Sequence, residues 1–147
     1  MKPHLSRRAL MACLMITVGT AGAQTASMKD VLRIRIDVGG QVLTATLVDN
    51  PTTRDLMLQL PLVLTAKDFM ATEKVAYPPR KLSVDGAPAS YTPVEGDLCY
   101  YGPWGNLALF YASGKPSPGL VLLGRFDGPV DALRKQGETA VRIERVR

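Results

Sequence analysis

The amino-acid sequence predicts a mainly β fold, a closed or nearly closed β-barrel with one short helix at each end. The first observation is that short apolar segments, several with the alternation of half-buried strands, recur from residue 31 onward. The second is that two stretches of helix length, residues 51–60 and 129–136, begin with an Asn-Pro or Gly-Pro signal. Many short strands with two helices are typical of a barrel that is plugged at its ends.

The first element is a β-hairpin. Apolar and charged residues alternate from Val31 to Val38, as in a strand with one buried face. Gly39 and Gly40 supply the positive φ angles of a tight turn, and the alternation resumes from Gln41 to Val48. The charged side chains of this hairpin are expected to form a solvated face.

A helix follows over residues 51–60. Asn50 can cap its free amide groups, and Pro51 suits the first helical position. Leu56 and Leu60 fall on one face, and Pro61 ends the helix. We expect this helix to close one end of the barrel.

The segment after this helix is less regular. Residues 62–64 form a short strand, and residues 65–70 suggest one helical turn with Thr65 as cap and Asp68 in the capping-box position. Residues 74–82 contain Pro78 and Pro79, which cannot donate to a strand ladder. They exclude a continuous central strand and indicate an edge strand or a bulge.

Residues 95–111 hold five of the nine aromatic residues, in two strands that flank a loop at residues 102–106. Trp104 lies at the loop tip, where an indole is unusual. It either folds back as a lid on the core or lines a pocket. The rule that large aromatic side chains are mostly buried favours the lid.

The remaining elements complete the barrel. Residues 119–126 form a buried strand because their apolar run is continuous, and Leu122, like Ile34, is expected in the interior. Residues 129–136 form the second helix, with its acidic residue first and its basic residues last, and Gly137 as its cap. Residues 139–146 form the closing strand.

Residues 1–23 are predicted to be a signal peptide. Lys2, Arg7 and Arg8 precede an apolar run, residues 9–18, that is too short to span a membrane, and Ala21-Gly22-Ala23 is a cleavage signal. The paired arginines also fit the twin-arginine export route, so both routes remain open. The mature protein, residues 24–147, is expected to be one barrel domain without a membrane span, periplasmic or secreted.

Charge and composition exclude several classes of function. Removal of Lys2, Arg7 and Arg8 lowers the basic count from 18 to 15, against 13 acidic residues, which argues against a nucleic-acid surface. The sole histidine, His4, is also removed, so histidine-based triads and ordinary zinc sites are excluded. No phosphate loop or nucleotide fingerprint occurs. The sequence predicts no metal and no cofactor.

The candidate catalytic groups are Asp97, Cys99 and Arg80. Asp97, two residues from Glu95, could do acid–base work, but a Gly-Asp at a strand start usually stabilises a turn. Cys99 is expected to be a buried, unreactive thiol. Arg80 is a cation on a proline-stiffened segment, either a surface ion-pair partner or a functional group.

Several segments resemble the bacterial cyclophilin-like fold proteins: VLRIRIDVGGQVLTATL, EKVAYPPRKL, GDLCYYGPWGNLALFY and GLVLLGRFDGPVDAL. The resemblance covers essentially the whole mature chain, and the block from Tyr101 to Tyr111 is its most specific part. It implies an eight-stranded barrel closed by two helices. True cyclophilins are prolyl isomerases, and of their catalytic groups only the arginine carries over, to Arg80. The strand from Asn106 to Phe110 lacks their glutamine, and their groove histidine and tryptophan have no counterpart near Gly119.

The favoured hypothesis is an extracytoplasmic, non-catalytic binding module that takes a small or peptide-like ligand in an aromatic groove. One alternative is a weak peptidyl-prolyl isomerase that uses Arg80, and another is a structural or assembly domain without a ligand. The position of Arg80 relative to the concavity that holds Phe110 distinguishes the first two. The predicted groove residues are Tyr77, Arg80, Tyr100, Tyr101, Trp104 and Phe110.

Overall fold

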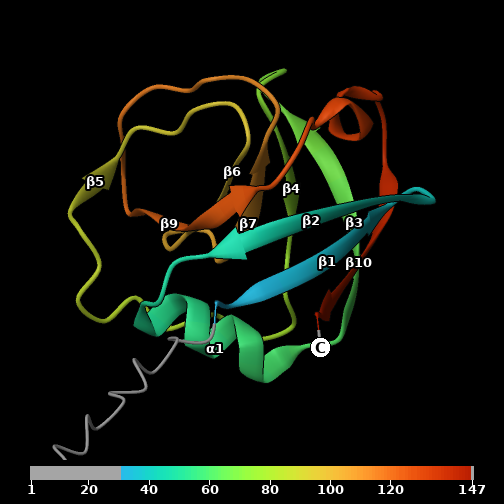
Figure 1. The fold of residues 1–147 in the computed structure, drawn as a ribbon. Coiled ribbons are helices and arrows are strands. Elements are labelled where there is room, and N and C mark those ends of the chain that lie inside the picture. Colours follow the sequence, from blue (N-terminus) through green and yellow to red (C-terminus); the bar gives the residue numbers. More distant parts are fainter. Residues whose placement is uncertain (1–30, 147) are drawn as a thin grey trace, which may run out of the picture.

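The computed structural model describes residues 31–146, which form a closed antiparallel β-barrel (Figure 1). The predicted fold class is therefore confirmed. Around the barrel the strands follow the order β1-β10-β3-β4-β7-β6-β9-β2. Their bounds are β1 Arg33–Val38, β2 Gln41–Leu47, β3 Leu62–Phe69, β4 Glu73–Ala76, β6 Asp97–Tyr101, β7 Asn106–Phe110, β9 Leu120–Phe126 and β10 Thr139–Arg145. Two short strands, β5 Ser90–Tyr91 and β8 Ser117–Pro118, pair separately. The predicted signal peptide and cleavage site lie outside the described residues.

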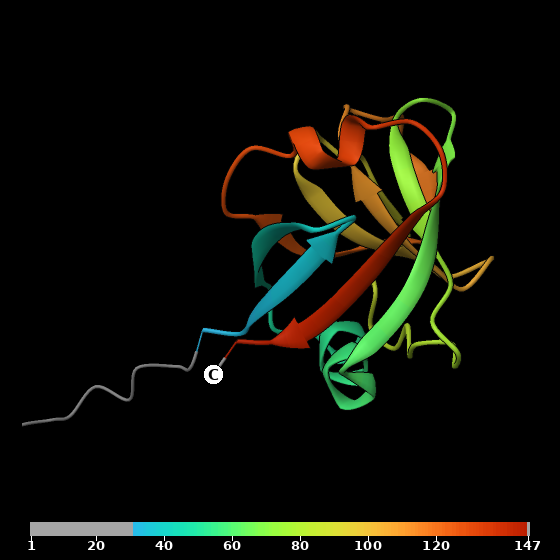
Figure 2. The same ribbon diagram turned by 90° about the vertical axis from the view of Figure 1, so that its right-hand side faces the viewer.

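Helix α1 (Pro51–Gln59) lies at one end of the barrel, as predicted (Figures 1 and 2). Asn50 caps it: its Oδ1 accepts a hydrogen bond from the Thr53 amide at 2.8 Å, and its Nδ2 donates to the Leu122 carbonyl at 2.9 Å. The buried Leu56 faces the core. Within residues 31–146 no helix has the length and apolar character that a membrane span requires.

The predicted helix at residues 129–136 is wrong in its extent. At the opposite end of the barrel the structure has only a 3-10 helix, η1 (Asp131–Arg134). Val130 offers no side-chain cap, and Lys135 is already extended. Helix α1 is of similar length but has the Asn50 cap, whereas the first amides of this segment have no capping side chain. Leu133 still packs into the core.

The helical turn predicted at residues 65–70 is also wrong, because β3 continues to Phe69 and pairs with both β10 and β4. Asp68 is no helix cap. Its carboxylate binds Lys74 Nζ at 2.9 Å and the Gly137 amide at 2.7 Å. Sheet pairing and this fully buried lysine outweigh the local helix signal.

Strand β4 has hydrogen-bonded neighbours on both sides, β3 and β7, so it is not at an edge. It ends at Ala76, before Pro78 and Pro79. The prolines therefore limit the length of the strand rather than its place in the sheet.

Apolar side chains lie on both faces of the sheet. Ile34, Leu107 and Leu109 belong to the main core inside the barrel. Ala108 and Phe110 alternate with those leucines and join an outer cluster with Cys99 and Leu120.

Leu122 packs against this outer cluster, so its predicted interior position is wrong. A continuous apolar run cannot show which residues face inward, because both faces are covered.

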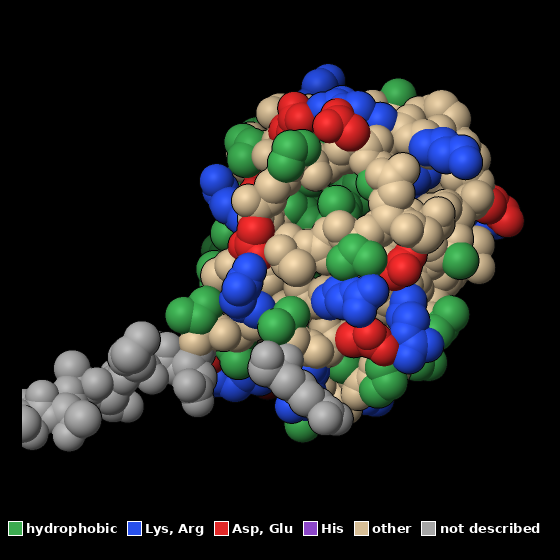
Figure 3. Space-filling view, turned by 45° about the vertical axis from the view of Figure 1, so that its right-hand side comes forward, with side chains coloured by type: hydrophobic (Ala, Val, Ile, Leu, Met, Phe, Trp, Pro, Cys, Tyr) green, Lys and Arg blue, Asp and Glu red, His purple; other side chains and the backbone are tan. Residues whose placement is uncertain are grey.

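The charges visible on one face of the molecule are mixed. Figure 3 shows Lys and Arg side chains among Asp and Glu side chains, around a hollow with hydrophobic side chains at its floor. That face presents no continuous basic surface.

Candidate ligand-binding pocket

A cavity of about 610 Å³ lies against the outer face of β7. The outward side chains Asn106 and Phe110 of β7, with Leu120, form part of its lining. The β3–β4 hairpin lines one side and residues 113–118 line another. This volume is in the range of small-molecule sites, about 300–1,000 Å³.

Trp104 stands at the tip of the β6–β7 hairpin. Gly105 has φ of 75° and donates its amide to the Tyr101 carbonyl at 2.8 Å, which closes the turn. The Trp104 side chain is 50% exposed, and its ring lies 5.4 Å from the rings of Phe69 and Tyr101, nearly perpendicular to both. The prediction of a lid on the core is therefore wrong, and the alternative that Trp104 lines a pocket is correct.

The β3–β4 hairpin supplies the part of the lining next to Trp104. Glu73 pairs with Phe69 on one side and with Phe110 on the other, so the three side chains form one row across three strands. Met70 lines the same pocket and, like Ala71, has φ of 52°. Non-glycine residues rarely adopt this left-handed conformation.

Glu73 and Lys115 are the two charged residues of the lining. Burial raises the pKa of the Glu73 carboxyl, and a hydrogen bond from Thr72 Oγ1 at 3.3 Å opposes the rise only in part. Within residues 31–146, Glu73 has no ion-pair partner. The pocket therefore holds a partly desolvated carboxylate that nothing in the described chain neutralises.

Asn106 adds a second acceptor to the lining. Its side chain is 1% exposed, and its Nδ2 donates to the Leu107 carbonyl at 3.1 Å. Its Oδ1 has no hydrogen-bond partner among the described residues. Buried polar atoms are usually satisfied, so this oxygen marks a polar point beneath the pocket surface.

The structure brings together three of the six predicted groove residues: Tyr101, Trp104 and Phe110 line the pocket. The other three lie elsewhere. Tyr100 is in the main core, where its hydroxyl accepts a hydrogen bond from the Leu82 amide at 2.9 Å. Tyr77 is 54% exposed just beyond the end of β4, outside the pocket lining.

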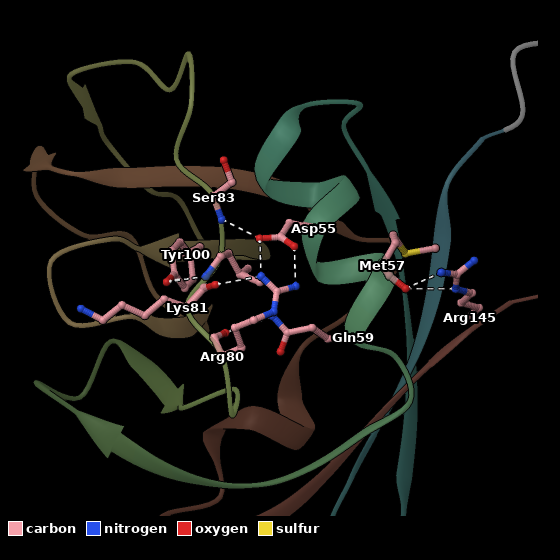
Figure 4. A network of polar contacts seen from close by, with 9 residues as sticks. Asp55, Met57, Gln59, Arg80, Lys81, Ser83, Tyr100 and Arg145 are labelled. Carbon is pink, nitrogen blue, oxygen red and sulfur yellow. Dashed lines mark hydrogen bonds and ion pairs between the residues drawn. The ribbon is translucent and has the colours of Figure 1, made fainter.

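Arg80 also lies outside the lining, and its guanidinium points toward α1 (Figure 4). It donates to both Asp55 carboxylate oxygens, at 2.6 and 3.1 Å, and this pairing holds the pKa of Asp55 below its usual value. The Ser83 amide donates to the same carboxylate at 2.7 Å. Arg80 is thus an ion-pair partner that joins residues 80–83 to the helix.

Asp97 and Cys99 have structural roles. Asp97 is fully buried, and its Oδ2 accepts from the Tyr91 hydroxyl at 2.8 Å and the Val94 amide at 2.9 Å. The Gly-Asp turn is therefore confirmed. Burial raises the pKa of the Cys99 thiol, and no histidine occurs among the described residues. Within residues 31–146, no cluster of three His, Cys, Asp or Glu side chains is placed to hold a metal ion.

The lining residues that the sequence interpretation missed include Phe69, Glu73, Asn106 and Lys115. The prediction of a helical turn at residues 65–70 is incompatible with the cross-strand pair that Phe69 and Glu73 form. The alternation of β7 was the signal that could have found Asn106, because it shares a face with Phe110.

Comparison with known proteins supports the fold. The chain matches the model of the cyclophilin-like family over residues 36–144. No curated protein matches. A solved structure, the solution structure of a hypothetical protein from Archaeoglobus fulgidus, is similar with a TM-score of 0.64 at 21% identity, over 79% of this chain and 95% of that one. The family match and the eight-strand closed barrel agree, and this chain belongs to the cyclophilin-like family.

Proposed function

We propose that this protein is an extracytoplasmic binding module that takes a small or peptide-like ligand in the pocket beside Trp104. The observation that carries the proposal is the half-exposed indole, which stands over a cavity of about 610 Å³ with a buried apolar residue, Phe110, in its lining. An aromatic side chain left open to solvent at a concave surface is typical of ligand recognition.

Binding is favoured over prolyl isomerisation because the one cation that the cyclophilin resemblance carries over is engaged elsewhere. Both donor arms of Arg80 are bound by Asp55, and Arg80 does not line the pocket that holds Phe110. Catalysis of this type requires a preorganised donor at the twisted prolyl amide. Between Asn106 and Phe110, β7 offers no further polar side chain, because Leu107 and Leu109 belong to the main core and Ala108 to the outer cluster.

The extracytoplasmic location is proposed from the sequence of residues 1–23, with its basic start, short apolar run and small-residue cleavage signal. N-terminal sequencing of the protein recovered from the exporting cell tests it. We expect the mature chain to begin at Gln24. Retention of residues 1–23 would contradict this part of the proposal.

Trp104 is the sole tryptophan of the chain, so its fluorescence reports directly on the pocket. The probes are acetyl-Ala-Ala-Pro-Phe-amide and benzyl alcohol, titrated against the mature protein. We expect a saturable change of emission with at least one probe. Binding measured by calorimetry should be weakened by Trp104→Ala and left intact by Tyr77→Ala, a similarly exposed aromatic outside the pocket. Absence of a saturable response to every ligand tested, neutral or cationic, would refute the proposal, and so would an equal loss of binding in both variants.

A further inference from the structure

Three aromatic rings form a corner on one side of the pocket. The Trp104 ring is 5.4 Å from both Phe69 and Tyr101, at interplanar angles of 89° and 77°. All three residues line the cavity. The face of each ring carries negative electrostatic potential, and rings set at right angles can enclose a group from more than one side. A cation is the group that such faces attract.

Glu73 adds a full negative charge to this lining. It is the cross-strand partner of Phe69, so its carboxylate leaves the sheet beside one of the three rings. It is partly buried and has no ion pair within residues 31–146. A desolvated carboxylate without a counterion is costly unless a cation joins it. The raised pKa of Glu73 agrees with this description.

Asn106 favours a cationic guest, and Lys115 does not neutralise Glu73. Asn106 Oδ1 is an unpartnered acceptor in a side chain that is 1% exposed. Lys115 is the single basic residue of the lining, and it lies exposed in the loop of residues 112–116. Within residues 31–146 it forms no ion pair with Glu73. It leaves the charge of Glu73 available and would weakly repel a bound cation.

We propose that the pocket recognises an organic cation, an alkylated ammonium group seated among Phe69, Tyr101 and Trp104 with Glu73 as its counterion. The inference rests on the proposed binding function and specifies its ligand class. A bulky alkylated ammonium suits this site because it is weakly hydrated and presents apolar surface to the rings while it keeps its charge. The group can belong to a small molecule or to a methylated lysine of a peptide, since the chemistry is shared.

The test compares ligands of equal shape and different charge. Choline chloride and its neutral isostere, 3,3-dimethylbutan-1-ol, are titrated against the mature protein at constant ionic strength, with Trp104 emission and calorimetry as readouts. We expect choline to bind about tenfold more tightly than the isostere. A third ligand, acetyl-trimethyllysine-amide, distinguishes a peptide source from a small-molecule source.

Two variants, each removing one charge from the pocket, test whether Glu73 is the counterion. Glu73→Gln should abolish the preference for choline over the isostere, whereas Lys115→Gln should keep or increase it. Choline affinity should also fall as the pH is lowered, because protonation of Glu73 removes the counterion, and it should do so above the usual carboxyl range. Thermal unfolding of Glu73→Gln checks that the variant is folded.

Equal affinity for choline and the isostere, with both bound, would overturn the cation inference and leave the proposed binding function standing. A choline preference that survives Glu73→Gln would also overturn it. If neither these ligands nor the neutral probes bind, the proposed function itself fails.

Discussion

Arg80 and Asp55 form a two-pronged ion pair, with nitrogen–oxygen distances of 2.6 and 3.1 Å, that ties the segment after β4 to helix α1. The same carboxylate accepts the Ser83 amide at 2.7 Å, and Gln59 Nε2 donates to the Arg80 carbonyl at 3.0 Å (Figure 4). Arg80, the arginine to which the cyclophilin resemblance points, therefore holds helix α1 against residues 80–83.

Asp55→Ala should destabilise the protein more than Arg80→Ala. Loss of the carboxylate leaves both the Arg80 guanidinium and the Ser83 amide without their acceptor, and an unsatisfied donor costs about 1–3 kcal/mol. The Arg80 side chain is 57% exposed, so water can replace part of what it loses. Urea unfolding of the two variants measures the difference. An equal or larger loss in Arg80→Ala would contradict this account of the pair.

Prolyl isomerisation of a short peptide should run near its uncatalysed rate, about tens to hundreds of seconds at room temperature. The reason is that the guanidinium of Arg80 is bound by Asp55 and lies outside the pocket lining. Arg80→Ala should leave the rate unchanged in a protease-coupled or NMR exchange assay. Strong acceleration that disappears in Arg80→Ala would restore the isomerase alternative.

Ile34 and Leu122 should differ in their contribution to stability. Ile34 is fully buried inside the barrel, so Ile34→Ala should cost about 2–5 kcal/mol, as for core aliphatic residues. Leu122 is partly buried at the outer cluster, and Leu122→Ala should cost less. Chemical denaturation checks both variants. Similar losses would mean that the outer cluster is packed as tightly as the interior.

Ala71→Gly should stabilise the β3–β4 hairpin. Ala71 has φ of 52°, a left-handed conformation that costs an L-residue about 1–2 kcal/mol and glycine almost nothing. Thermal unfolding should therefore shift upward by an amount equivalent to about 1 kcal/mol. Ala71 is not among the residues that line the pocket, so ligand affinity should be unchanged. A lower unfolding temperature would show that the turn is not strained at this residue.

Met70→Asn provides the matched case at the same turn. Met70 also has φ of 52°, and asparagine tolerates this region better than methionine. Because Met70 lines the pocket, this variant should be more stable yet bind apolar ligands less tightly. Unchanged affinity for apolar ligands would show that Met70 does not contact the bound ligand.

Asp127 should make the protein sensitive to acid. Hydrogen bonds from Arg33, Thr46 and Thr44 hold its pKa at about 2, below the ordinary 3.8. Since the folded-state pKa is the lower one, Asp127 stabilises the fold above pH 3.8, and this contribution is lost as the pH falls toward about 2. In Asp127→Asn the free energy of unfolding should be lower at neutral pH and should change less over that acid range. An unaltered pH profile would contradict this role.

The sequence alone determined most of the barrel. Alternation in β1, β2 and β10, the Gly39-Gly40 turn and the Asn50 cap of α1 are local signals, and the structure has each element within about two residues of its predicted bounds. These features depend on neighbouring residues in the chain, so a pattern in the sequence is sufficient to reveal them.

Tertiary structure decided the remaining local conformations where pairing outweighed propensity. Residues 65–70 carry the pattern of a helix start, but the ladders with β10 and β4 and the partly buried Lys74–Asp68 pair extend β3 to Phe69. Residues 129–136 carry a helix pattern as well, but only Asp131–Arg134 are helical, as a single 3-10 turn without a side-chain cap.

Only the tertiary structure decided which residues form the pocket. The sequence identified the aromatic stretch and three lining residues, Tyr101, Trp104 and Phe110, because they are close together in the chain. The association of Trp104 with Phe69, and of Phe110 with Glu73, depends on β4 lying between β3 and β7. Such a strand order depends on pairing between residues that are far apart in the chain. The tertiary structure also places Arg80 beside α1 instead of the pocket, where its guanidinium pairs with Asp55.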